Sequence, residues 1–198
     1  MINSIAQILK KHPLLTTWIS AIWNIAYGVF HLYIGVDNSS YWYITLAAFF
    51  LTLGFARLMV LAENRNENSR MRSLAHMLFF LAIVISGTTT LTITETINPI
   101  KNEILVIAQA AYTFSVLIAA VYNTVTSYRK KDKTAIMIRN ISLASALGSL
   151  FSLERTMLRT FGTSKDTLFN TCIEAFTGLL IFTVLNILAY NLLKKSKE

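Results

Sequence analysis

Six long apolar stretches divide the sequence, and charged residues are concentrated in the short segments between them. The stretches cover about residues 14–36, 40–61, 74–96, 104–128, 136–159 and 167–193. An α-helix needs about 20 mostly apolar residues to cross the hydrocarbon core of a bilayer, and each stretch has that length. The pattern predicts an all-α membrane protein, a six-transmembrane-helix bundle that forms a single polytopic domain over residues 1–198.

The low charge content supports this prediction. Only 14% of the residues are charged and 54% are hydrophobic, whereas a soluble domain carries about a quarter charged residues. The formal net charge of +8 does not indicate a nucleic-acid partner, because the basic residues lie in short loops between apolar stretches. We therefore expect the lipid bilayer to be the main partner of the chain.

The distribution of lysine and arginine predicts the orientation in the membrane. Thirteen of the 18 lie in the N-terminal segment, the second-to-third linker, the fourth-to-fifth linker and the C-terminal segment. Lys101, Arg159 and Lys165 are the three on the opposite side. Cytoplasmic loops carry an excess of Lys and Arg, so we expect the N-terminus and the C-terminus to be cytoplasmic.

The fifth stretch carries hydroxyl groups at regular steps of three and four residues. They belong to Ser142, Ser145, Ser149, Ser152 and Thr156. At 100° per residue these five positions lie within about 80° of one helix face. Small hydroxyl-bearing residues allow membrane helices to approach closely, so we predict that this face is a helix-packing surface inside the bundle.

Charged groups at membrane depth are costly and mark an ion pair or a functional site. With the N-terminus inside, the outer half of the bundle contains seven candidates for a polar cavity or an ion pair: Glu174, Arg155, Arg159, Glu154, His31, Gln109 and Tyr112. We predict that Glu174 faces an arginine of the fifth stretch, either across an outward-opening cavity or in a structural ion pair. Arg57 lies about one turn from the cytoplasmic end of its stretch, and we expect it to extend to the interface.

Two polar positions in the first stretch share their spacing with two in the fourth. Asn24 and Tyr27 have the same separation as Gln109 and Tyr112. If the six spans were two repeats of three, the repeats would have inverted topology. Two matching positions are too few to establish such a repeat from the sequence.

Known catalytic and metal-binding motifs do not occur in the chain. There is no H-E-x-x-H, P-loop or G-x-S-x-G sequence, and the single cysteine, Cys172, can form neither an intramolecular disulfide nor a metal site alone. His12, His31 and His76 lie in different segments. We therefore assign no catalytic residue and expect no metal and no cofactor.

Three passages carry a resemblance that covers most of the chain. They are YWYITLAAFFLTLGFARL (41–58), AAYTFSVLIAAVYN (110–123) and ISLASALGSLFSLERTML (141–158). Together they resemble a group of uncharacterised six-span integral membrane proteins of low-GC Gram-positive bacteria. The resemblance implies a multi-pass protein of the bacterial plasma membrane, and it implies no mechanism. The group often has an uncharged residue where this chain has Glu154, which argues against a catalytic role for that carboxylate.

Three functions remain open at this point. The first is a transporter or channel-like protein for a small polar or anionic solute, which the polar helix faces favour. The second is a non-catalytic interaction protein, such as an immunity, sensor or assembly subunit, acting as a homo-oligomer or with a membrane partner protein. The third is a membrane-embedded enzyme that uses His31 and Glu174 as acid and base. A water-filled pocket that reaches Glu174 would favour the first or third function, and a bundle packed without such a pocket would favour the second.

Overall fold

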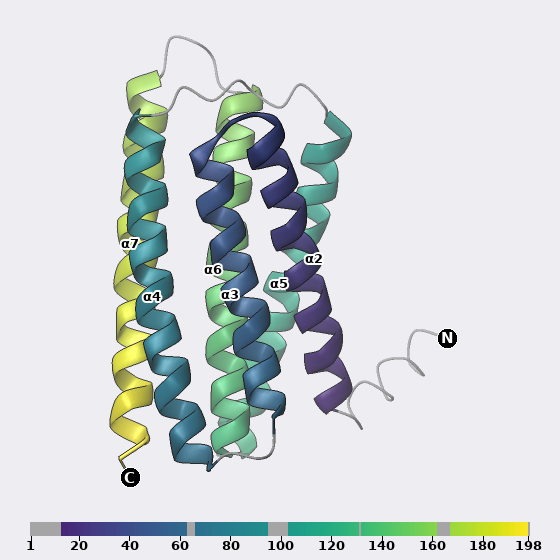
Figure 1. Ribbon diagram of the computed structural model, residues 1–198, viewed down its shortest axis with the longest axis vertical. Helices are drawn as coiled ribbons and strands as arrows, with labels where there is room; N and C mark the ends of the chain where they lie inside the picture. The colour runs from purple at the N-terminus through teal and green to yellow at the C-terminus, as the bar shows by residue number, and fades with distance from the viewer. Residues whose placement is uncertain (1–12, 63–65, 95–102, 131, 162–166, 198) are drawn as a thin grey trace.

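The computed structural model describes residues 13–62, 66–94, 103–130, 132–161 and 167–197, and it folds them into long α-helices (Figure 1). These are α2 (Pro13–Asp37), α3 (Tyr41–Leu61), α4 (Glu67–Thr94), α5 (Glu103–Lys130), α6 (Lys133–Phe161) and α7 (Thr167–Lys195). The described residues contain no β-strand. The prediction of an all-α fold is therefore confirmed.

Five of the helices are long and apolar enough to cross a membrane when the described residues are considered. The qualifying segments are Thr16–Asp37, Tyr41–Leu61, Glu67–Ile93, Lys133–Leu158 and Leu168–Lys195. Helix α5 lies in the same bundle (Figure 1) but is not among the five. The fold is thus that of a multi-pass helical membrane protein.

The helices form two layers of three (Figure 1). Helices α2, α3 and α4 make one layer, and α5, α6 and α7 make the other. Within the layers α2 packs on α3 and α5 packs on α6, and between the layers α4 packs along α7. The middle helices α3 and α6 also contact each other, so they form the centre of the bundle.

A glycine on α6 permits the two middle helices to approach. A Cβ atom at Gly148 would overlap the ring of Phe49 on α3, and the Phe49 side chain is fully buried. Close approach through small residues is the usual way in which membrane helices gain packing energy. The close packing of α3 on α6 therefore depends on the absence of a side chain at Gly148.

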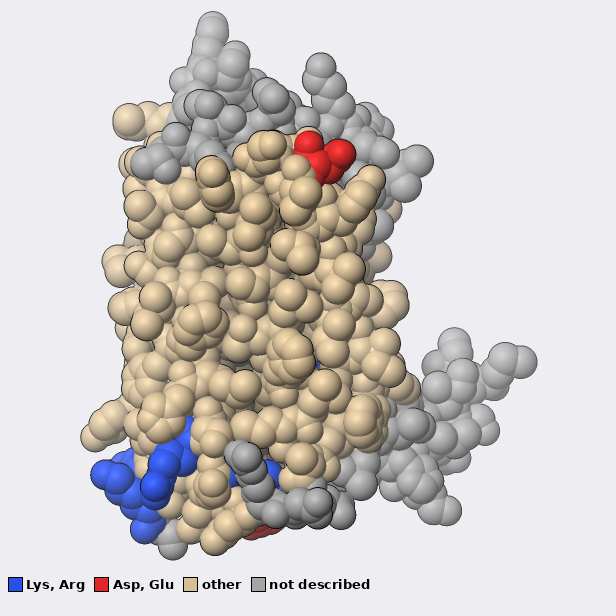
Figure 2. Space-filling model, in the orientation of Figure 1, with Lys and Arg blue, Asp and Glu red and all other residues tan. Residues whose placement is uncertain are grey.

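On the face drawn in Figure 2, the described residues show almost no charged side chains around the middle of the bundle, and the charged ones lie toward its ends. Large side chains such as Trp23, Ile83, Ile118 and Leu179 are more than half exposed, which a soluble protein of this size would avoid. The visible lysines and arginines gather at the end where α7 ends. This distribution matches a bundle surrounded by lipid.

Candidate functional site: a polar network between the helix layers

The hydroxyl-bearing face of α6 lies inside the bundle. Ser142, Ser145, Ser149 and Ser152 are each at most 2% exposed, and Thr156 is 6% exposed. The face is directed toward α5 and α2, because its hydroxyl groups bond to side chains of both helices. The hydrogen bonds form two neighbouring groups, one of His31, Gln109, Ser152 and Thr156 and the other of Asn24, Tyr112 and Ser145, and we call the two groups together the polar network.

One end of the polar network lies nearer the turn between α2 and α3, and we call it the outer end and the opposite one the inner end. At the outer end the side chains form a chain of hydrogen bonds. Gln109 donates from Nε2 to Ser152 Oγ at 2.6 Å, and Thr156 donates from Oγ1 to Gln109 Oε1 at 3.0 Å. His31 donates from Nδ1 to the carbonyl oxygen of Tyr27 at 2.9 Å, since a carbonyl can only accept. In the neutral imidazole, Nε2 therefore accepts, and it lies 3.5 Å from Ser152 Oγ.

At its inner end the network converges on Asn24, which is 2% exposed. Tyr112 donates its hydroxyl hydrogen to Asn24 Oδ1 at 3.2 Å, and Ser145 donates to the same oxygen at 3.1 Å. The Nδ2 atom of Asn24 is buried and has no hydrogen-bond partner. A buried donor without a partner is uncommon and calls for an explanation.

Aromatic rings fill the space between α2 and α5. The ring of Tyr27 stacks on that of Tyr112, with centroids 4.0 Å apart and planes inclined by 21°, and Phe50 of α3 meets Tyr27 edge-on at 4.7 Å. Tyr27 and Tyr112 hold matching places in the spacing shared by the first and fourth stretches. Two residues related by a two-fold axis at this point would meet in this way.

The deepest carboxylate is paired with an arginine. Arg155 of α6 donates from Nη1 to Glu174 Oε2 of α7 at 2.9 Å, and both side chains are at most 2% exposed. The Arg155 guanidinium also lies over the Trp42 ring, 4.7 Å from its centroid. Thr177 donates to the half-buried Glu154 at 3.0 Å, and the side chain of Arg159 lies outside the described residues. The ion pair is closed off from solvent and joins α6 to α7.

The structure places Arg57 differently from the sequence-based expectation. Its side chain is 5% exposed and therefore does not extend to the interface. Within the described residues, no carboxylate lies at ion-pair distance from it, and its Nε has no hydrogen-bond partner. On the same side of α3, Gly54 lies against Ile25 of α2 and Phe50 meets the Tyr112 ring with centroids 6.3 Å apart. Arg57 is thus a buried cation on the side of α3 that faces α2 and α5.

Helical periodicity could have located Arg57. It follows Phe50 by seven residues and Gly54 by three, and these spacings keep all three on one side of a helix. Phe50 contacts the tyrosine stack, and a Cβ at Gly54 would overlap Ile25 of α2. The sequence-based argument considered only the distance of Arg57 from the helix end, so it missed the face on which the arginine lies.

No family model matches this chain, and no curated protein matches it. Its function must therefore be argued from the arrangement of its own residues. Within the described part of the chain, no group of three His, Cys, Asp or Glu side chains could hold a metal ion. The described interior offers hydrogen-bonding groups, the Arg155–Glu174 ion pair and the Arg57 cation.

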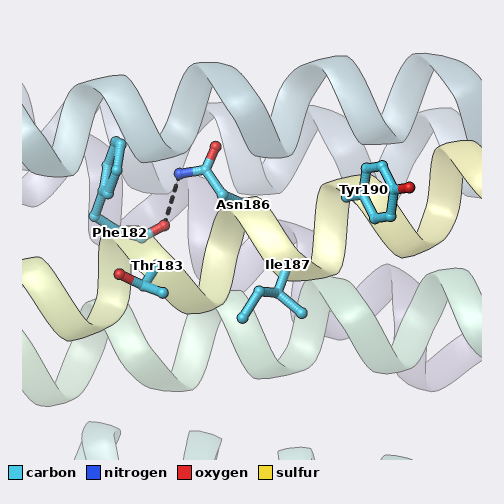
Figure 3. Close-up of a pocket in the computed structure, with 5 residues that line it drawn as sticks. All are labelled: Phe182, Thr183, Asn186, Ile187 and Tyr190. Atoms are coloured by element: carbon cyan, nitrogen blue, oxygen red, sulfur yellow. Dashed lines mark hydrogen bonds between the residues drawn. The ribbon is translucent and has the colours of Figure 1, made fainter.

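A shallow groove on the outer side of α7 lies apart from the polar network (Figure 3). It is lined by Phe182, Thr183, Asn186, Ile187 and Tyr190. The Asn186 amide donates to the Phe182 carbonyl at 2.8 Å, and Thr183 donates to Leu179. Because these polar groups bond to their own helix, they leave the groove apolar. Its lining fits a lipid chain or another helix better than a polar solute.

Proposed function

We propose that this chain is a six-span protein of the bacterial plasma membrane, with both termini in the cytoplasm, and that it binds and moves a small polar or anionic solute. Helix α5 is the sixth span in this proposal, since it packs on α6 and carries one side of the polar network. The gathering of basic side chains at one end of the bundle (Figure 2) supports the orientation, because basic residues favour the cytoplasmic side.

The observation that carries the solute-binding proposal is that Arg57, a buried cation, has no described acceptor at its Nε, and that the buried Asn24 Nδ2 also lacks one. Helix packing alone requires no uncompensated cation, and such a group is costly at membrane depth. Solute sites in many transporters lie between two structural halves near the middle of the membrane. The position of the polar network between the layer of α2 and the layer of α5 and α6 supports a solute site there.

The test is the thermal stability of the purified protein against a panel of small polar and anionic solutes. A solute that binds the folded state raises the unfolding temperature. We expect at least one anionic solute to do so and to enter proteoliposomes that contain the protein. Ser115→Leu, on the exposed face of α5, is a control that should respond like wild type. A panel that produces neither stabilisation nor uptake would refute the proposal.

A second candidate, a non-catalytic interaction protein, is favoured by the Arg155–Glu174 pair. Glu174 has no exposed surface, so no wet pocket reaches it among the described residues, and the pair holds α6 to α7. An interaction subunit would co-purify with a membrane partner in a fixed ratio, and its stability would rise with the partner and not with solutes. The two candidates therefore differ in which addition stabilises the protein.

A further inference from the structure

Three arginines are buried among the described residues, and two of them have acceptors while one does not. Arg155 is paired with Glu174 at 2.9 Å. Arg70 donates to the Val60 carbonyl at 2.8 Å and lies 4.0 Å from Glu67. Arg57 makes neither kind of contact with any described residue. An arginine cannot lose its charge in a protein, so its guanidinium needs an acceptor that the described part of the chain does not supply.

A second buried donor without a partner, Asn24 Nδ2, lies on α2. Asn24 Oδ1 accepts the Tyr112 hydroxyl hydrogen at 3.2 Å. The Tyr112 ring in turn lies 6.3 Å from the ring of Phe50, which is on the same side of α3 as Arg57. A Cβ at Gly54, one turn above Arg57, would be 3.5 Å from the Ala21 carbonyl oxygen, so this side of α3 faces α2 below Asn24. The two donors therefore face the same region, where α2, α3 and α5 come together.

We propose that Arg57 and Asn24 form a binding site for a small anion, with a carboxylate or a comparable oxyanion as the ligand. This inference rests on the proposed solute-binding function and names its chemical class. The forked N–H groups of a guanidinium match the two oxygens of a carboxylate, and Asn24 Nδ2 donates a further hydrogen bond. The Oδ1 atom of Asn24 is already held by Tyr112 and Ser145, so the amide is fixed with its NH₂ group available.

The position of the aromatic stack gives the direction of access. Tyr27, Tyr112 and Phe50 contact one another on the outer side of Arg57. Arg57 itself lies four residues from the end of α3 at Leu61, about 6 Å along the helix axis. The shorter way to the site is thus from the end where α3 ends, which is the cytoplasmic end in the proposed orientation, because the aromatic stack lies on the opposite side.

The experiment measures unfolding temperature during titration with sodium formate, phosphate or chloride. The ionic strength is held constant with a bulky sulfonate buffer salt, and the protein is kept in nanodiscs of zwitterionic lipid. The wild type should show a saturable rise with formate or phosphate. Arg57→Lys keeps the positive charge but loses the forked pair of N–H donors. It should weaken the apparent affinity for the anion about ten- to a hundredfold.

Two further variants should fold stably, so that a lost response in them cannot be caused by misfolding. Without added anion, Arg57→Met should be at least as stable as wild type, and it should no longer respond to formate. Asn24→Asp places a carboxylate beside Arg57 while still accepting from Tyr112 and Ser145, so it should be stable and equally unresponsive. Asn38→Asp, the matched amide-to-carboxylate change at an exposed position outside the polar network, should keep the response.

The results separate this site from the proposed function. A wild type that ignores all three anions, or a response that survives in both Arg57→Met and Asn24→Asp, overturns the site. If anionic lipid alone raises the unfolding temperature to the same extent and abolishes any further response to formate or phosphate, the ligand is a lipid headgroup. That result also overturns the site for a small anion. If anion binding depends on Arg57 but no uptake into proteoliposomes occurs, the anion site is supported and the transport function is refuted. If uptake occurs and does not depend on Arg57, the transport function is supported and the anion site is refuted.

Discussion

Breaking the Arg155–Glu174 pair should be the most damaging conservative change in the bundle. The two groups are at most 2% exposed and 2.9 Å apart, so solvent does not screen the charge that remains when one is removed. Removing one partner of a buried ion pair costs about 3–5 kcal/mol. In Glu174→Gln the amide oxygen still accepts from Arg155, so we expect a loss near the lower limit, about 3 kcal/mol. For a chain of this length that corresponds to a fall in unfolding temperature of about 6–12 °C.

The assay is a double-mutant cycle on purified protein, with Glu174→Gln, Arg155→Met and the double variant unfolded by heat and by detergent titration. Each single variant leaves one buried group without its counter-charge, and the double variant leaves none. The double variant should therefore recover more than half of the larger single loss. If the two single losses add to within about 0.5 kcal/mol of the double, the pair is not energetically coupled and the reasoning is wrong.

Two further predictions test the orientation and the packing of α6. In a Cys172→Ser background, Asn38→Cys should react with an impermeant thiol reagent from outside intact cells and Asn66→Cys should not, because the two exposed positions lie in turns at opposite ends of the bundle. The reverse labelling pattern would invert the topology. Ser149→Leu should overpack the interior and cost about 1–3 kcal/mol, whereas Ser115→Leu on the lipid side should be neutral. Equal effects at both serines would mean that the α6 face is assigned wrongly.

The sequence predicted features that follow from a regular period. Hydroxyl residues at steps of three and four on the fifth stretch define one side of a helix, and the structure buries the side from Ser142 to Thr156. Glu174 lies too far from a helix end to reach the interface, so it requires a partner, and the structure supplies Arg155. In both cases local geometry along one helix was enough.

Contacts that depend on how two helices lie side by side were harder to predict from the sequence. Asn24, Tyr27, Gln109 and Tyr112 share a spacing, but spacing does not say that Tyr27 and Tyr112 stack on each other. Nor does it say that the amide of Gln109 bonds to Ser152 on its neighbour α6 while that of Asn24 bonds across to α5 and α6. Such contacts arise from the arrangement of the layers, which no single stretch encodes.

The contrast between Arg57 and Arg155 shows where the molecule departs from what packing alone would select. Both arginines are buried on the middle helices, α3 and α6, which contact each other at the centre of the bundle. On α6 the charge is matched by Glu174 and by the Trp42 ring, so it fastens one helix to its neighbours. On α3 the charge has no described counterpart, and a methionine there would fill similar volume without the cost of desolvation. Residues that conflict with the usual preferences of their surroundings and gain no packing energy in exchange tend to occur at functional sites. The stability of Arg57→Met relative to wild type in the absence of anions is therefore the most direct measure of whether this bundle gives up stability for binding.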